Sequence, residues 1–199
     1  MVVIPAVYFG NIEYFHLLLE HNEIGISTVD GYRKQTYRNR CSILTANGVM
    51  KLSIPVDRTN GANTLTSEAQ ITYAANWQKD HLKALESAYR KSPYYEFYID
   101  ELEAVFAKQH TSLIEFNLEL TQWLIDRIGL SCTLQTINKP LGDEYKFSVD
   151  PKNKSTFNTY PYIQTFSERF EFEPNLSVLD LLFNEGPNSI SILTESKKG

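Results

Sequence analysis

The hydrophobic and polar positions in the first part of the chain follow periods that predict a strand, a helix and a second strand. Residues 2–7 form a short apolar run, interrupted by Pro5, that is typical of a buried strand. Apolar residues then recur at helical spacing over residues 11–21, and residues 24–29 form a second apolar run. This order favours a parallel strand pair, so we predict a βαβ unit.

A β-hairpin is the clearest local prediction. Two β-rich runs flank Ala46-Asn47-Gly48, and Asn-Gly is the strongest two-residue signal for a hairpin turn. The polar residues 57–67 are expected to form a surface loop, and residues 69–73 a further strand.

Helices are predicted over most of the middle of the chain. Apolar residues recur at helical spacing in three segments, which are residues 76–91, 94–108 and 112–128. The last of these begins with a capping box at Ser112 and ends before Gly129, which suits the position after a helix.

The C-terminal part of the chain is predicted to contain a long loop, a helix and a strand. Residues 137–161 have no regular period and contain three prolines, so we expect a loop there. Residues 175–186 predict a short helix that ends at Gly186-Pro187. A final strand is expected around residues 190–193.

These elements together predict one α/β domain spanning residues 1–199. We expect a mixed sheet that begins with the βαβ unit and is extended by the hairpin, with three to four helices packed on it. No apolar run approaches the length of a membrane span, and no cation precedes the apolar N-terminus. The expected localisation is therefore cytoplasmic.

The charge is distributed unevenly along the chain. The net charge of −5 argues against nucleic acid as a partner. Yet four cations, Arg33, Lys34, Arg38 and Arg40, fall within the eight residues RKQTYRNR. Guanidinium groups bind phosphate or carboxylate through paired hydrogen bonds, so this segment predicts a site for a small anion. The alternative is a solvated loop whose charges only keep the protein in solution.

Three further side chains carry candidate chemistry. His81 shares a helix face with Trp77 and is either a hydrogen-bonded core residue or a general base in a cleft. Cys41 is either a thiol activated by the neighbouring cations or, as we favour, a buried strand residue. Asn117 lies on an apolar stripe, where its amide is expected to hold a neighbouring backbone.

Metal and cofactor chemistry are not predicted. The two cysteines, Cys41 and Cys132, are 91 positions apart, and the four histidines form no paired ligand motif. The glycine-rich nucleotide motifs and the serine-hydrolase motif are also missing from the sequence.

Several segments spread along the chain resemble the WbqC-like protein family. The matching segments are Tyr8-Phe-Gly-Asn-Ile-Glu-Tyr-Phe15, Tyr32-Arg-Lys34, Tyr37-Arg-Asn-Arg40, Lys51-Leu-Ser-Ile-Pro-Val56, Trp77 with His81, Ala88-Tyr89, Pro93-Tyr-Tyr95, Tyr162-Ile-Gln-Thr-Phe166 and residues 174–186. The chain departs from the family at Ile4-Pro-Ala-Val-Tyr-Phe9, where many members have a Gln-Pro-x-Tyr-x-Pro pattern. The resemblance implies a role in bacterial surface-polysaccharide (O-antigen type) biosynthesis.

The working hypothesis is a cytoplasmic transferase that acts without a metal on a nucleotide-activated amino sugar or a similar anionic substrate. In this hypothesis His81 is the general base. The residues expected to bind the substrate are Arg33, Lys34, Arg38 and Arg40 for its anionic group, Asn39 and Gln164 for hydrogen bonds, and Tyr32, Trp77 and Tyr89 for stacking.

The alternative hypothesis is a non-catalytic protein that binds a glycan precursor or acts as a scaffold for a biosynthetic partner. The basic segment would then serve recognition only. The sequence does not determine the oligomeric state.

Overall fold

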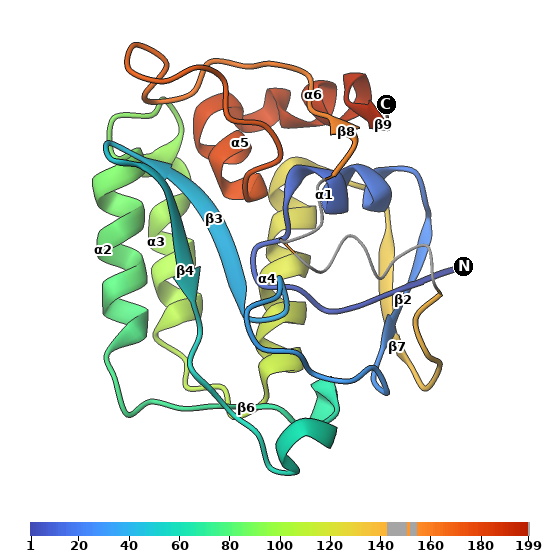
Figure 1. The fold of residues 1–199 in the computed structure, drawn as a ribbon. Coiled ribbons are helices and arrows are strands. Elements are labelled where there is room, and N and C mark those ends of the chain that lie inside the picture. The colour runs from blue at the N-terminus through green and yellow to red at the C-terminus, as the bar shows by residue number, and fades with distance from the viewer. Residues whose placement is uncertain (143–150, 152–154, 199) are drawn as a thin grey trace.

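Helices and short strands alternate along the chain and confirm the predicted mixed α/β class (Figure 1). The structure is a computed structural model that describes residues 1–142, 151 and 155–198. The strands are β1 (Val2–Ile4), β2 (Glu23–Ser27), β3 (Arg40–Thr45), β4 (Gly48–Ser53), β5 (Val56–Asp57), β6 (Gln70–Ile71), β7 (Thr133–Ile137), β8 (Phe157–Asn158) and β9 (Lys197–Lys198). The α-helices are α1 (Ile12–Leu19), α2 (Trp77–Tyr89), α3 (Tyr95–Phe106), α4 (Leu113–Ile128), α5 (Val178–Glu185) and α6 (Ser189–Glu195).

The predicted βαβ unit is confirmed. Strands β1 and β2 pair in parallel, with Val2 opposite Ile24, and α1 connects them. The side chain of Asn11 caps α1 by accepting a hydrogen bond from the backbone N–H of Tyr14. Strand β7 pairs in parallel with the other edge of β2, so the sheet has the order β1-β2-β7.

The predicted hairpin is also confirmed, but it does not extend the parallel sheet. Within the part of the chain that the structure describes, strands β3 and β4 pair only with each other, with Thr45 opposite Gly48. Gly48 has a φ of 96°, a conformation that the tight turn requires and that glycine adopts without strain. Strand β3 contacts α2 and α5 instead of a strand of the parallel sheet, so the hairpin forms a sheet of its own.

The three central helices lie where the sequence predicts them. Helix α4 begins at Ser112, whose side chain accepts a hydrogen bond from the backbone N–H of Glu115, and ends at Gly129 in the left-handed conformation. Figure 1 shows α2 and α3 on one side of the molecule, the parallel sheet on the other and α4 between them. Among the described residues, no helix combines the length and apolar character needed to cross a membrane.

The final strand predicted at residues 190–193 is wrong, because this segment belongs to helix α6. Its alternating residues Ile190 and Ile192 suggested a strand. The residues that are buried, however, are Ser189, Ile192 and Leu193, which share one face of a helix. Much of the loop predicted over residues 137–161 lies outside the described residues; of the rest, β7 continues to Ile137 and β8 pairs with β9.

Candidate functional site

The basic segment that connects β2 to β3 is folded around a buried ion pair. The guanidinium group of Arg38 contacts Oδ2 of Asp30 through Nη2 at 2.7 Å and through Nε at 2.8 Å. The side chains of Arg38 and Asp30 are 6% and 4% exposed. Thr66 donates a further hydrogen bond to the same carboxylate oxygen at 2.9 Å. Arg38 therefore holds two parts of the chain together. Its predicted role in anion binding would require the guanidinium group to face solvent, and it does not.

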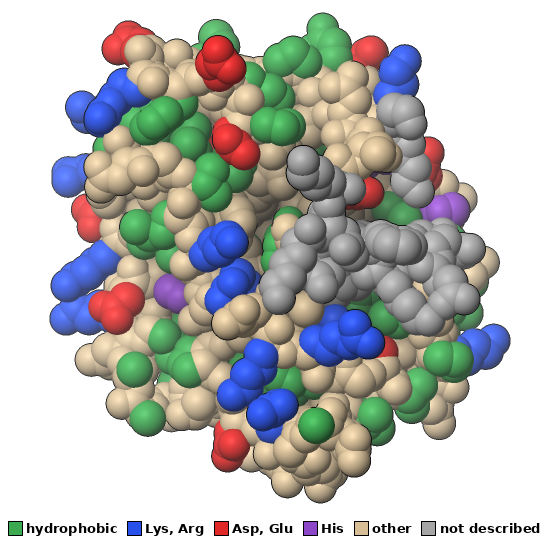
Figure 2. Space-filling view, in the orientation of Figure 1, with side chains coloured by type: hydrophobic (Ala, Val, Ile, Leu, Met, Phe, Trp, Pro, Cys, Tyr) green, Lys and Arg blue, Asp and Glu red, His purple; other side chains and the backbone are tan. Residues whose placement is uncertain are grey.

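The other members of the basic segment differ in exposure. Arg33 and Lys34 are exposed, and Arg40 is half-buried, with its Nε donating to the Ser53 hydroxyl at 2.9 Å. Asn39 is buried, and its amide nitrogen donates to the backbone carbonyl of Ile54 at 2.9 Å. Lys and Arg side chains gather on the face of the molecule shown in Figure 2, over the lower part of the hairpin and below it.

Tyr32 is the most informative residue of this region. Its side chain is 4% exposed, and its buried hydroxyl has no hydrogen-bond partner among the described residues. Burial raises the pKa of Tyr32 to about 12. The positive charges of Arg58, Arg38 and Arg40 have the opposite effect and lower this pKa. The phenol oxygen thus lies within the field of three guanidinium groups.

Arg58 joins this region through backbone pairing. The backbone N–H of Tyr32 donates to the carbonyl of Thr64, and that of Thr66 donates to the carbonyl of Asp30. These bonds place residues 58–66 beside the basic segment, with Arg58 half-buried. We call Tyr32, Arg40 and Arg58 the arginine site, because they combine an unpartnered buried hydroxyl with two guanidinium groups outside the Asp30 ion pair.

His81 is linked to the arginine site indirectly, through Ser53. Its ring is 5% exposed, and Nδ1 lies 2.8 Å from the hydroxyl of Tyr8. Burial lowers the pKa of His81 to about 4, although a hydrogen bond to the backbone of Ser53 and the charge of Asp80 raise it. The imidazole is therefore neutral near pH 7, with Nδ1 hydrogen-bonded to Tyr8 and the ring also interacting with the backbone of Ser53.

Ser53 connects His81 to the arginine site. Its backbone accepts from the imidazole, and its side chain accepts from Nε of Arg40. The ring of His81 thus interacts with both Tyr8 and Ser53, and the residue is almost fully buried. This geometry suits a residue that positions its neighbours better than it suits a general base.

Trp77 is part of the aromatic core. Its ring is 4% exposed and contacts His81, Phe106 and Phe116, with ring centroids between 5.3 and 5.9 Å apart. The face that we predicted would stack on a sugar or base is covered by these rings.

Tyr89 and Gln164 meet at a fully buried carboxylate. The Tyr89 hydroxyl donates to Oδ1 of Asp180 at 2.8 Å, and the amide of Gln164 donates to Oδ2 at 3.1 Å. Tyr162 donates a third hydrogen bond to Oδ2 at 2.6 Å. Burial raises the pKa of Asp180, while these three donors lower it. The structure brings Tyr89 and Gln164 together here and does not join them to the arginine site by any hydrogen bond among the described residues.

Two of the remaining candidates have structural roles. The Asn117 amide donates to the backbone carbonyl of Arg38 at 2.7 Å, as predicted for an amide on an apolar stripe. Cys41 is fully buried, and burial raises the pKa of its thiol well above the usual range. This burial favours the strand-residue interpretation of Cys41.

Sequence reasoning missed Arg58 and Asp180. Arg58 follows an acidic residue in a polar stretch, and only the backbone pairing with Tyr32 and Asp30 brings it to the site. The signal that could have found Asp180 is its position among Leu179, Leu181 and Leu182 in a short apolar helix. Among the described residues, no three His, Cys, Asp or Glu side chains are grouped as metal ligands would be.

The fold and the site define an α/β protein with a cationic surface next to a buried aromatic and histidine core. The chain belongs to the WbqC-like protein family, whose family model matches residues 6–146. It is 24% identical over 217 aligned positions to a protein of Mycobacterium tuberculosis (strain ATCC 25618 / H37Rv) named "Uncharacterized protein Rv1507c", and the alignment covers 94% of each chain. No solved structure gives a significant match.

Proposed function

We propose that this protein binds a small phosphate- or carboxylate-bearing molecule at the arginine site. The observation that carries the proposal is the Tyr32 hydroxyl, which is buried without a partner among the described residues and lies in the field of the Arg40 and Arg58 guanidinium groups. A buried polar group without a hydrogen bond costs about 1–3 kcal/mol. An anion that accepts from this hydroxyl offsets that cost.

The charges of the site support an anionic ligand. Guanidinium groups donate charge-assisted hydrogen bonds to phosphate and carboxylate, and partial burial strengthens such bonds. Arg40 and Arg58 are both half-buried, and binding requires their flexible side chains to turn toward the ligand and open access to Tyr32. The exposed Arg33 and Lys34 add positive charge that attracts an anion as it approaches.

A nucleotide-activated sugar is the ligand class that we propose for the site. Its diphosphate supplies adjacent anionic groups for the two guanidinium side chains, and the resemblance that links the family to surface-polysaccharide biosynthesis supports this choice.

Binding, and not group transfer by His81, is the function that this geometry supports best. A general base needs a free ring nitrogen within reach of the proton that it removes. The nearly fully buried ring of His81 is engaged with Tyr8 through Nδ1 and interacts with the backbone of Ser53. We propose that His81 is a positioning residue, which fixes Ser53 and through it the side chain of Arg40.

The test is a calorimetric titration with UDP-N-acetylglucosamine and, separately, with inorganic phosphate. We expect Arg40→Gln and Arg58→Gln each to weaken binding of the nucleotide sugar at least tenfold, because hydrogen bonds to charged groups contribute about 1.5–3 kcal/mol. Tyr32→Phe should weaken binding severalfold while leaving the stability of the free protein unchanged, because its hydroxyl has no partner to lose.

Arg127→Gln is the matched control, since Arg127 is a partly exposed cation on α4 that pairs with Glu101. It should leave the dissociation constant within twofold of wild type. Equal affinity of wild type and Arg40→Gln for every probe would refute the site. The transferase hypothesis would instead be supported if wild type releases UDP from the nucleotide sugar and His81→Gln does not, while both proteins bind the nucleotide sugar with the same affinity.

A further inference from the structure

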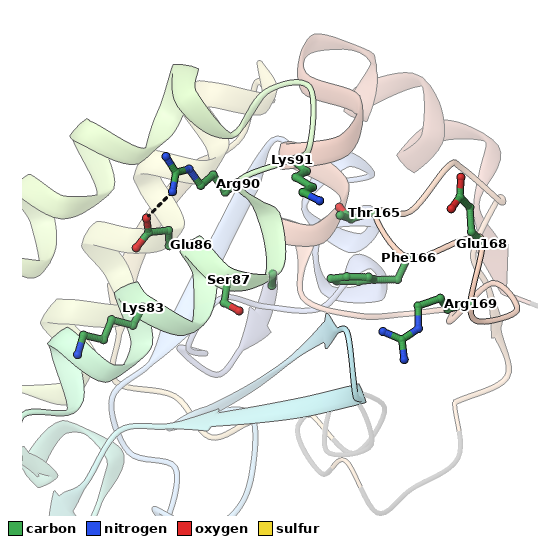
Figure 3. A pocket seen from close by; sticks show the side chains of 10 residues that line it. Lys83, Glu86, Ser87, Arg90, Lys91, Thr165, Phe166, Glu168 and Arg169 are labelled. Carbon is green, nitrogen blue, oxygen red and sulfur yellow. Dashed lines mark ion pairs between the residues drawn. The ribbon is translucent and has the colours of Figure 1, made fainter.

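A separate cleft lies between helix α2 and the segment 165–169 (Figure 3). Its volume is about 770 Å³, within the range of cavities that hold small molecules and cofactors. None of the residues of the arginine site lines it. Its lining comes on one side from the second half of α2 and the two residues that follow this helix, and on the other from Thr165, Phe166, Glu168 and Arg169.

The cleft presents one aromatic ring. Phe166 is half-buried, and Figure 3 shows its ring extending from the segment 165–169 toward α2, near Ser87. Aromatic side chains in this half-exposed position stack on the planar rings of ligands such as nucleobases. A ring fixed at one edge of a cavity therefore predicts a ligand with a flat apolar part.

The charges around the ring are mainly positive, although the chain as a whole has a net charge of −5. Four cations line the cleft, Lys83, Arg90, Lys91 and Arg169, against the carboxylates of Glu86 and Glu168. Arg90 pairs with Glu86 at 3.6 Å.

Three of these cations have no carboxylate partner of their own. Lys83, Lys91 and Arg169 form no ion pair with any described residue. Arg169 instead lies over the ring of Phe170, 5.8 Å from its centroid. Such an excess of unpaired cations in a cavity favours an anionic ligand.

Both walls of the cleft are anchored to the same helix. On the α2 wall, Tyr89 is next to Ala88 and donates to the buried carboxylate of Asp180 on α5. On the opposite wall, Gln164 is next to Thr165 and donates to the same carboxylate. Thr165 also donates to Oδ1 of Asn184, one turn further along α5, at 3.0 Å. The two walls are thus held at a fixed separation before a ligand arrives, which lowers the entropy cost of binding.

We propose that this cleft binds a nucleotide, with the base stacked on Phe166 and the phosphates held by Lys91 and Arg169. A nucleotide has both features that the lining selects, a planar ring and adjacent phosphate charges. The site is independent of the arginine site, because the two share no residue.

The experiment is a calorimetric titration of the full chain with uridine diphosphate, with uridine and inorganic pyrophosphate as separate probes. We expect uridine diphosphate to bind more tightly than either part. The double variant Lys91→Gln Arg169→Gln should weaken its binding at least tenfold and reduce the salt dependence. Phe166→Leu, which keeps an apolar side chain, should weaken uridine diphosphate at least fivefold and leave pyrophosphate within twofold.

Lys79→Gln is the matched control, because Lys79 is an exposed lysine on the same helix outside the cleft. It should change neither affinity. The proposal is overturned when uridine diphosphate does not bind wild type, when both cleft variants bind it as wild type does, or when pyrophosphate binds equally well. If Arg40→Gln alone removes uridine diphosphate binding, the nucleotide occupies the arginine site and the cleft proposal fails by itself.

Discussion

Replacing Arg38 by methionine should destabilise the protein strongly, although Arg38 lies in a segment that looks like a surface cation cluster in the sequence. The substitution keeps the unbranched apolar stem of the side chain and removes the guanidinium group that contacts Asp30 at 2.7 and 2.8 Å. Asp30 is 4% exposed, and Thr66 is its other side-chain donor. Removing one partner of a buried ion pair costs about 3–5 kcal/mol, because the remaining charge is left uncompensated.

The comparison variants separate this effect from a general effect of lost positive charge. Arg33→Met and Lys34→Met remove exposed cations from the same segment and should change the free energy of unfolding by no more than about 0.5 kcal/mol. The double variant Asp30→Asn Arg38→Met removes both charges. It should cost less than the sum of the two single variants, since no buried charge remains.

The assay is urea denaturation followed by the fluorescence of Trp77 and Trp123 and by far-ultraviolet circular dichroism. A shift in the midpoint with an unchanged slope measures stability alone. A loss below about 1 kcal/mol in Arg38→Met, or a double variant that equals the sum of the single ones, would show that Asp30 and Arg38 do not form the buried pair described above.

Two further predictions concern the other buried polar groups. Tyr89→Phe removes the hydroxyl that donates to Oδ1 of Asp180. In urea denaturation this variant should lower the free energy of unfolding by about 1–3 kcal/mol. An unchanged free energy of unfolding would argue against the hydrogen-bond network around Asp180. For His81, burial lowers the pKa to about 4 in the folded state, below the value of about 6.5 in the unfolded chain. The unfolded chain therefore takes up the proton first as the pH falls, so wild type should lose roughly 3 kcal/mol of stability between pH 7 and pH 4. His81→Gln should lack this loss; the same pH dependence in both proteins would contradict the assigned protonation state.

Local elements could be predicted from the sequence because their signals are local. The Ala46-Asn47-Gly48 turn, the Ser112 cap and the Gly129 stop each specify a backbone conformation within a few residues. The final strand was wrong because the apolar residues Ile190, Ile192 and Leu193 form a segment too short for its period to distinguish a strand from a helix. Whether the hairpin joins the parallel sheet depends on contacts with α2 and α5, which the period does not encode.

The candidate site was less predictable because burial decides the role of a charged side chain. Arg33, Arg38 and Arg40 have the same side chain. In the structure, however, Arg33 is exposed, Arg38 is buried in an ion pair and Arg40 is half-buried. Tyr89 and Gln164 were placed with the basic segment because both are polar residues of the resemblance. Their partner, Asp180, is distant from both in the sequence, so no local pattern joins them.

The buried ion pair also determines how binding experiments on this segment are to be interpreted. Asp30 accepts hydrogen bonds from Arg38 and from Thr66, and so connects the basic segment to the stretch that carries Arg58. Loss of ligand binding in an Arg38 variant would follow from displacement of Arg58 as readily as from a lost contact with the ligand. The variants that distinguish the two are Arg40→Gln and Arg58→Gln, because neither side chain takes part in the ion pair. A ligand that depends on Arg38 and not on these two residues would move the site away from Tyr32.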